Sequence, residues 1–198
     1  MAKVTLEELI AGVCAGVVVS FPTDTVPALA VLPEKAALIF ATKQRSQDKP
    51  LILMAAKAED LWTYVQGSAG EYEIWQQLVN QYWPGALTLV LPASDRVPSA
   101  MNPNDPTTIG IRVPNSAIAQ QILSQTGPLA TTSANLSGQP ALETMAEIDA
   151  QFPEVLTLKS TDTEFFRENT ALSQPSTVAK WTGSNWQILR QGALHLDV

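Results

Sequence analysis

Hydroxyl and cationic side chains gather directly after the apolar runs of this sequence. The set comprises Thr23, Asp24, Thr25, Lys43, Arg45, Lys49, Thr108, Arg112, Thr131, Thr132, Ser133, Asn135, Ser176 and Arg190. Guanidinium groups bind phosphate oxygens in pairs of hydrogen bonds and lysine supplies a point charge, so cations mixed with hydroxyls suit a polyphosphate. The whole chain has a formal net charge of −7. This distribution would focus a positive field in a cleft within a negative surface.

Each of these groups also has an interpretation that involves no ligand. A Lys-x-Arg loop is commonly solvated surface, and Thr or Ser after a strand commonly caps the next helix. The Pro-Thr-Asp-Thr insert in the apolar stretch 17–31 is either a tight turn or a ligand loop at the end of a strand. Arg112 differs, because an arginine within a strand-like run must be paired or face a polar cavity. Spacing alone leaves both interpretations open and does not specify a reaction.

Composition excludes several classes of protein. The only histidine is His195, three residues from the C-terminus, which excludes serine–histidine triads and histidine-rich metal sites. Neither Gly-x-x-x-x-Gly-Lys nor Gly-x-Gly-x-x-Gly occurs, so any nucleotide is held by other means. The acidic balance argues against salt-driven binding to nucleic acid. The single Cys14 excludes an internal disulfide, and we expect it to be a small buried hydrophobe.

The apolar runs are too short for a membrane span, and the N-terminus has the pattern of an amphipathic helix and not of a signal peptide. We therefore expect a cytoplasmic protein. The length of 198 residues suits one domain over residues 1–198.

The elements that must position the polar groups follow from hydrophobic periodicity. A Thr5–Glu8 capping box starts a helix over 6–15, and further helices are predicted at 33–42, twice within 58–82, from the cap Asn115 to about 125, and at 143–151. Buried strands are predicted at 17–21, 51–56, 87–93, 107–114, 129–132 and 154–159, and a hairpin joins 176–181 to 185–190. This alternation predicts one α/β domain around a twisted mixed sheet.

Seven motifs follow one another along the chain from about Leu6 to Gly192. They read FPTDTV, KQR followed by KPLIL, WPGALTLVLPA, TIGIRVP, TTSANLSGQPA, PSTV and ILRQGA. In this order and spacing they resemble the YrdC-like threonylcarbamoyl-AMP synthase family in its single-domain form. The resemblance implies a twisted mixed parallel and antiparallel sheet with flanking helices and a large concave cavity.

By this resemblance the activity is formation of threonylcarbamoyl-AMP and pyrophosphate from L-threonine, bicarbonate and ATP, for threonylcarbamoyladenosine in tRNA. Mg²⁺ accompanies ATP, and no metal is tightly held by the protein. A downstream tRNA threonylcarbamoyl transferase is the implied partner, with at most weak RNA contact and no membrane contact. The reaction depends on alignment and charge neutralisation, and needs no protein nucleophile.

The resemblance also assigns residues to the two substrates. The L-threonine side comprises Thr25, Arg112 and Thr131, with Arg112 on the carboxylate. The ATP side comprises Lys43, Arg45, Lys49, Thr108, Ser133, Asn135, Ser176 and Arg190, of which Lys43 and Arg45 are expected to be catalytic.

Two motifs depart from the family pattern. Relatives continue the first motif as Thr-Val-Tyr-Gly-Leu-Gly, whereas this chain has Pro27 and Ala28 in place of the tyrosine and the first glycine. Lys180 stands where an aspartate is common. Because Pro27 fixes φ and removes a backbone N–H, we expect weak synthase activity. The alternative function is a nucleotide- or RNA-binding paralogue with weak or no synthase activity.

Overall fold

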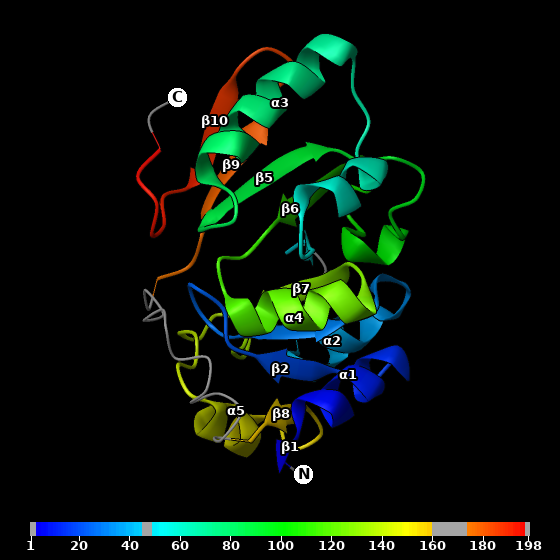
Figure 1. Ribbon diagram of the computed structural model, residues 1–198, viewed down its shortest axis with the longest axis vertical. Helices are drawn as coiled ribbons and strands as arrows, with labels where there is room; N and C mark the ends of the chain where they lie inside the picture. The colour runs from blue at the N-terminus through cyan, green and yellow to red at the C-terminus, as the bar shows by residue number, and fades with distance from the viewer. Residues whose placement is uncertain (1–2, 45–48, 160–173, 197–198) are drawn as a thin grey trace.

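The computed structural model describes residues 3–44, 49–159 and 174–196 of the chain. Over these residues ten strands form one sheet in the order β1-β8-β2-β3-β7-β4-β6-β5-β9-β10 (Figure 1). Their bounds are Lys3–Val4 (β1), Val19–Phe21 (β2), Ala28–Val31 (β3), Ile52–Met54 (β4), Leu87–Pro92 (β5), Thr108–Arg112 (β6), Leu129–Ser133 (β7), Leu156–Leu158 (β8), Thr177–Trp181 (β9) and Trp186–Arg190 (β10).

Five α-helices flank this sheet within the described ranges. They are Leu6–Cys14 (α1), Ala37–Thr42 (α2), Ala69–Tyr82 (α3), Ala117–Thr126 (α4) and Met145–Gln151 (α5). Reciprocal side-chain to backbone hydrogen bonds start three of them, at Thr5, Ser68 and Thr144, and so satisfy N–H groups that a helix leaves unpaired. None of the described helices combines the length and the apolar character that crossing a bilayer requires.

Alternation along the central strands separates a packed core from an open face. In β5 the side chains of Leu87, Leu89 and Leu91 are fully buried in the larger hydrophobic core. Thr88 and Val90 point to the other side, where they line a cavity. Strands β4, β6 and β9 obey the same period of two, so the sheet offers one face to the core and the other to a ligand.

Helices cover the two ends of the sheet differently (Figure 1). Helix α3 lies beside β9 and β10, where Trp75 makes an edge contact with Trp181 at 6.5 Å between ring centroids. Helices α1 and α4 contact each other and pack Leu9, Val13 and Ile122 into a second core over β2, β3 and β7. Both ends of the sheet are thus anchored, and the cavity lies over the strands between them.

The predicted mixed α/β sheet with flanking helices is confirmed. Strand β4 pairs with β6 and β5 pairs with β9 in parallel, whereas β5 pairs with β6 in antiparallel fashion. The predicted C-terminal hairpin is β9 with β10, which pair in antiparallel fashion.

The prediction of a strand, a loop and then a helix at the first motif is wrong. Residues Ala28–Val31 form β3, which pairs with β2 on one side and with β7 on the other. The Pro-Thr-Asp-Thr stretch is therefore a connection between antiparallel strands and not a βα loop. Ala-Leu-Ala-Val is short and weakly β-prone, so its strand depends on long-range pairing that local propensity does not report.

Four smaller predictions are corrected, and the two-residue strand β1 was not predicted. Within 58–82 the structure has two short 3-10 turns, Ala58–Asp60 and Trp62–Tyr64, and only one α-helix. Helix α4 is capped by Ser116, whose hydroxyl accepts from the N–H of Ala119 at 3.4 Å, and not by Asn115. Residues 33–42 are a 3-10 turn followed by a shorter α-helix. Cys14 is exposed, because it follows the core-facing Val13 and points about 100° away from it.

Candidate functional site

A cavity of about 460 Å³ opens over the strands between the two anchored ends of the sheet. Its wall contains seven residues that the sequence assigned to substrates, namely Thr25, Thr108, Arg112, Thr131, Ser133, Ser176 and Arg190. Lys43, Lys49 and Asn135 do not belong to the wall, and Arg45 lies outside the described residues. The fold therefore brings all three residues of the predicted threonine group and four of the eight residues of the predicted ATP group to one surface.

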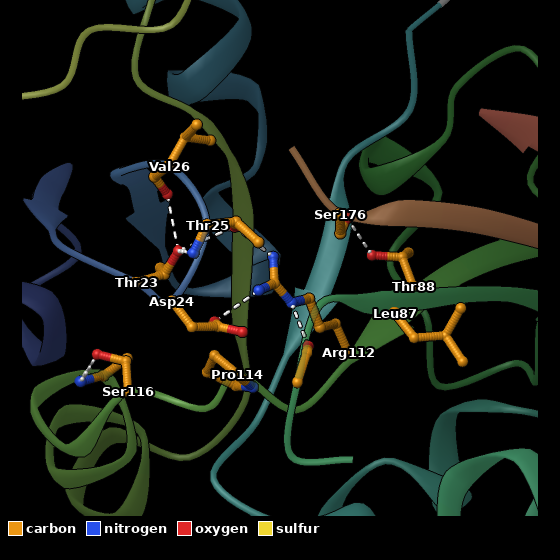
Figure 2. Close-up of polar contacts among 12 residues, drawn as sticks. Thr23, Asp24, Thr25, Val26, Leu87, Thr88, Arg112, Pro114, Ser116 and Ser176 are labelled. Carbon is orange, nitrogen blue, oxygen red and sulfur yellow. Dashed lines mark hydrogen bonds and ion pairs between the residues drawn. The ribbon is translucent and has the colours of Figure 1, made fainter. Parts of the chain in front are cut away.

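Arg112 is the most constrained cation of the cavity (Figure 2). Its Nε donates to the carbonyl oxygen of Gly85 at 3.0 Å and its Nη1 donates to Thr25 Oγ1 at 2.9 Å. Its Nη2 donates to Asp24 Oδ1 at 2.6 Å, which is also an ion pair. An arginine in this strand was expected either to be paired or to face a polar cavity. Arg112 does both, since it pairs with Asp24 and belongs to the cavity wall.

The pKa of the Arg112 guanidinium is shifted mainly by burial. Desolvation lowers the pKa of the Arg112 guanidinium, and the adjacent Asp24 carboxylate opposes that shift. Arg190 lowers the pKa of Arg112 further, since two like charges face one cavity. Asp24 neutralises only Arg112, so the charge of Arg190 remains as an excess of positive charge, which favours an anionic ligand.

A β-bulge directs Arg190 into the cavity. Ile188 lies opposite Ala179 and packs on the larger core, and regular alternation would turn residue 190 to that same side. The register shifts by one residue between Ile188 and Arg190, so Arg190 lies opposite Val178 on the cavity side. Its Nη2 donates to the carbonyl oxygen of Ser176 at 2.8 Å. The hydroxyls of Ser176 and Thr88 are 2.9 Å apart beside it (Figure 2).

Lys43 lies beneath the loop that carries Ser133 and Asn135. Its side chain is fully buried, and Nζ donates to the carbonyl oxygen of Ser133, to Asn135 Oδ1 at 3.2 Å and to Thr132 Oγ1 at 3.4 Å. Asn135 Nδ2 in turn donates to the carbonyl oxygens of Leu136 and Gln139. Lys43 thus supports the loop from below. Of Lys43, Ser133 and Asn135, only Ser133 belongs to the cavity wall.

We expect Lys43→Ala to lower the free energy of unfolding by about 1–3 kcal/mol, because buried oxygens lose their donor. ATP affinity should fall with it, since the loop that presents Ser133 loosens. Urea unfolding and ATP calorimetry measure the two effects, and the exposed Lys35→Ala is the matched control, with a change within about 0.5 kcal/mol. Loss of ATP affinity at unchanged stability would instead mean that Lys43 contacts phosphate directly.

Asp105 and Lys180 lie at the cavity wall near Thr108. Asp105 accepts from the hydroxyls of Thr107 and Thr108, and these bonds, together with the charge of Lys180, lower the pKa of the Asp105 carboxyl. Asn102 Nδ2 donates to Thr108 Oγ1 at 3.2 Å. The Thr108 hydroxyl is thus bonded within the protein on both sides, while Lys180 adds a cation to this part of the wall.

The segment after β10 crosses closely over the start of β9. The N–H of Gly192 donates to Thr177 Oγ1 at 2.9 Å, and the N–H of Ala193 donates to the carbonyl oxygen of Pro175 at 2.9 Å. A Cβ on Gly192 would lie 2.2 Å from the oxygen of Pro175 and 2.5 Å from the carbonyl carbon of Ser176. Only glycine fits at this crossing.

We expect Gly192→Ala to lower the free energy of unfolding by about 1–3 kcal/mol and to weaken ATP binding, because backbone that carries Ser176 must shift. Thermal unfolding and ATP calorimetry test both effects. Gly70→Ala is the control, since nothing lies within 4 Å of its Cβ, and this helical substitution should stabilise the protein by about 0.5–1 kcal/mol. An unchanged ATP affinity in Gly192→Ala would contradict the assignment of Ser176 and Arg190 to the nucleotide.

Sequence reasoning gave no substrate role to several residues that the cavity uses. Thr88 and Asn102 lie in the wall and bond to assigned residues, whereas Asp24 lies behind Arg112. The alternation of Leu-Thr-Leu-Val-Leu in β5 carried a signal for Thr88, because a polar residue inside an apolar strand marks the face away from the core. Asp24 was grouped with Thr23 and Thr25 in the sequence but was assigned no partner.

The donor set of the cavity does not fit a resident divalent cation. Mg²⁺ prefers oxygen ligands that include carboxylates, whereas this wall presents mainly cations, hydroxyls and apolar groups. Among the described residues no group of three or more His, Cys, Asp or Glu side chains is arranged to hold a metal ion.

Comparison with known proteins agrees with this architecture. The Sua5/YciO/YrdC family model, described as "Telomere recombination", matches residues 13–192. Threonylcarbamoyl-AMP synthase of Vibrio campbellii is 33% identical over 192 residues, which cover 94% of this chain and 98% of that protein. The human threonylcarbamoyl-AMP synthase is 34% identical over 154 residues, which cover 76% of this chain and 53% of the human protein.

Solved structures show the same fold. A variant of P. abyssi Sua5 superposes with a TM-score of 0.83 at 30% identity, covering 96% of this chain and 56% of that chain. P. abyssi Sua5 in complex with L-threonine superposes with a TM-score of 0.80 at 28% identity, covering 96% and 54%. This chain thus spans just over half the length of both Sua5 chains. From the match over most of the sequence and the common fold we conclude that the chain belongs to the Sua5/YciO/YrdC family.

Proposed function

We propose that this protein is an L-threonylcarbamoyladenylate synthase, a nucleotidyltransferase that uses L-threonine, bicarbonate and ATP. The observation that carries the proposal is one cavity with Arg112 beside the Thr25 loop and Arg190 beside Ser176. Arginine binds carboxylate and phosphate in the same forked geometry, so the cavity can hold an amino acid next to a nucleotide. The names of relatives at 33–34% identity support this activity.

The proposed reaction needs no protein nucleophile. The amine of L-threonine captures carbon dioxide from bicarbonate as a carbamate, whose oxygen attacks the α-phosphorus of ATP, and pyrophosphate leaves with the electron pair of the broken P–O bond. Thr25, Arg112 and Thr131 would hold the amino acid, with Thr108, Ser133, Ser176 and Arg190 on the nucleotide side. The protein contributes alignment and neutralisation of developing charge. Mg²⁺ would enter as part of the substrate on the phosphates of ATP.

Lys43 and Asn135 would then act from beneath the nucleotide loop. Lys49 and Arg45 are the further cations proposed for the phosphates of ATP. A cytoplasmic location and transfer of the product to a tRNA threonylcarbamoyl transferase complete the proposal. A weak contact with RNA belongs to the same proposal.

Pyrophosphate release from ATP tests this function. The expected result is release that requires both L-threonine and bicarbonate, with threonylcarbamoyl-AMP detected by mass spectrometry. Release that continues unchanged without threonine would contradict the proposal. ATP binding by calorimetry with no pyrophosphate under any condition would support the alternative, a binding paralogue that retains the cavity and lacks the chemistry.

A further inference from the structure

Asp24 is bonded to Nη2 of the Arg112 guanidinium (Figure 2) and is not one of the residues of the cavity wall. The side chains of Arg112 and Asp24 are 5% and 10% exposed, and their charged atoms are 2.6 Å apart. Thr25 and Arg112, in contrast, both belong to the wall. A ligand in the cavity would therefore meet the guanidinium and the hydroxyl, with the carboxylate as their support.

The guanidinium keeps donors for a ligand after its bonds to the protein are made. Arginine has five N–H groups, and those of Arg112 donate to Gly85, Thr25 and Asp24. Among the described residues these are the hydrogen-bond acceptors of Arg112, which leaves two N–H groups. Two donors match one carboxylate.

The hydroxyls of Thr23 and Thr25 form a chain of hydrogen bonds in which each donor can be assigned. Thr23 Oγ1 donates to the carbonyl oxygen of Val26 at 2.8 Å, which uses its only hydrogen. In the 3.1 Å contact between the two threonine hydroxyls, Thr25 must then be the donor. Because Thr25 Oγ1 also accepts from Arg112, it keeps one lone pair and no hydrogen for a ligand. Thr25 can accept from an ammonium group and cannot donate to a carboxylate or phosphate.

Charge at this end of the cavity is balanced only because of Asp24. Arg112 and Arg190 face the same cavity; burial is the main cause that lowers the pKa of the Arg112 guanidinium, and the positive charge of Arg190 lowers it further. The ion pair of Arg112 with Asp24 has no net charge. It therefore suits the α-carboxylate and α-ammonium groups of an amino acid, which together also have no net charge. Without Asp24, two guanidinium groups would favour the ligand with the highest negative charge.

We propose that Asp24 determines which class of ligand binds at Arg112, by orienting and neutralising the guanidinium so that it takes a zwitterionic α-amino acid and rejects a phosphate group. This inference rests on the proposed function and goes beyond it by making Asp24 a positioning residue for specificity. Arg190 remains the cation for phosphate, since no carboxylate among the described residues forms an ion pair with it.

The test is the affinity for L-threonine with and without saturating inorganic pyrophosphate, measured by calorimetry in the absence of ATP. In the unmodified protein we expect pyrophosphate to leave threonine affinity unchanged. In Asp24→Asn, which keeps shape and an acceptor but not the charge, threonine affinity should fall about tenfold and pyrophosphate should compete with threonine. Asp24→Glu keeps the charge, so it should bind threonine more weakly but still without competition.

Asp60→Asn is the matched control, because it removes the carboxylate of an exposed ion pair with Lys57 outside the cavity. It should change neither affinity nor competition. If Asp24→Asn binds threonine as tightly as the unmodified protein and shows no competition, the inference is overturned.

A second measurement needs no variant. The unmodified protein should bind L-threonine much more tightly than 3-hydroxybutyrate, which has the carboxylate and hydroxyl but lacks the ammonium group. Equal affinity for the two would overturn the inference, because Thr25 would then have no ammonium to accept from. A protein that discriminates in this way but releases no pyrophosphate would contradict the proposed function alone.

Discussion

Replacing Arg112 with alanine should abolish measurable L-threonine binding and lower the free energy of unfolding by about 3–5 kcal/mol. The stability loss is expected because Asp24 would be left as a buried carboxylate without its counter-ion. The loss of binding follows from removing the two N–H groups of Arg112 that its bonds to the protein leave for a ligand. Calorimetry with L-threonine and urea unfolding measure the two effects separately.

The double variant Asp24→Ala with Arg112→Ala distinguishes the two causes. Removing both charges leaves no unpaired ion, so part of the lost stability should return while threonine binding stays absent. The exposed Arg96→Ala is the control for removing an arginine, with a change within about 0.5 kcal/mol. ATP affinity should be reduced much less than threonine affinity. Equal loss of both ligands in Arg112→Ala would mean that the cavity collapses and that the residue is structural.

Arg112 also shows which parts of the site the sequence could predict. A charged residue inside an apolar strand must be paired or solvated, and that rule concerns one residue and its neighbours along the strand. The continuous apolar run of β4 and the mainly apolar run of β5 are equally local signals, since length and composition distinguish them. For this reason the mixed sheet with flanking helices was predicted correctly, and nine of the fourteen polar residues named from the sequence lie in the cavity wall.

The parts that were missed depend on contacts between distant segments. Strand β3 exists through its pairing with β7, about a hundred residues later in the chain. Lys43 has partners in the loop at Ser133 and Asn135, so its burial and its support of that loop could not be predicted from its own polar segment of the sequence. The bulge that turns Arg190 toward the cavity is a register shift, which no local pattern in Trp-Gln-Ile-Leu-Arg reports.

Pro27 and Ala28 of the first motif involve both local sequence signals and contacts with a distant segment. Pro27 and Ala28 line the cavity, and they are the positions at which the resemblance to the family implies tyrosine and glycine. The carbonyl oxygen of Pro27 accepts from the N–H of Ala134 at 2.9 Å, and Ala28 pairs with Ser133 in the ladder of β3 with β7. Gln44 is the only non-glycine residue of the described chain with a positive φ, so Ala28 adopts an ordinary strand conformation. A glycine is thus not required at this position for backbone reasons.

We therefore expect the combined variant Pro27→Tyr and Ala28→Gly to raise the rate of adenylate formation by about ten- to a hundredfold in single-turnover experiments. The physical reason is the aromatic ring and the backbone N–H that position 27 regains next to Thr25, since misplacement of the reacting carbamate by about 1 Å costs a comparable factor. Threonine affinity should change far less than the rate, because Arg112 and Thr25 stay in place.

The single variant Ala28→Gly separates the effect of the tyrosine at position 27 on the rate from the effect of the glycine at position 28. It should give no gain in rate and should cost about 0.5–1 kcal/mol of stability, because glycine loses more conformational freedom in a strand than alanine does. If this single variant matched the double variant, space beside Ser133 and not the ring at position 27 would limit the reaction. If the unmodified chain already formed the adenylate as fast as the Vibrio campbellii relative, Pro27 and Ala28 would be neutral substitutions. The loop between β2 and β3 would then owe its role to Asp24, Thr25 and their bonds to Arg112.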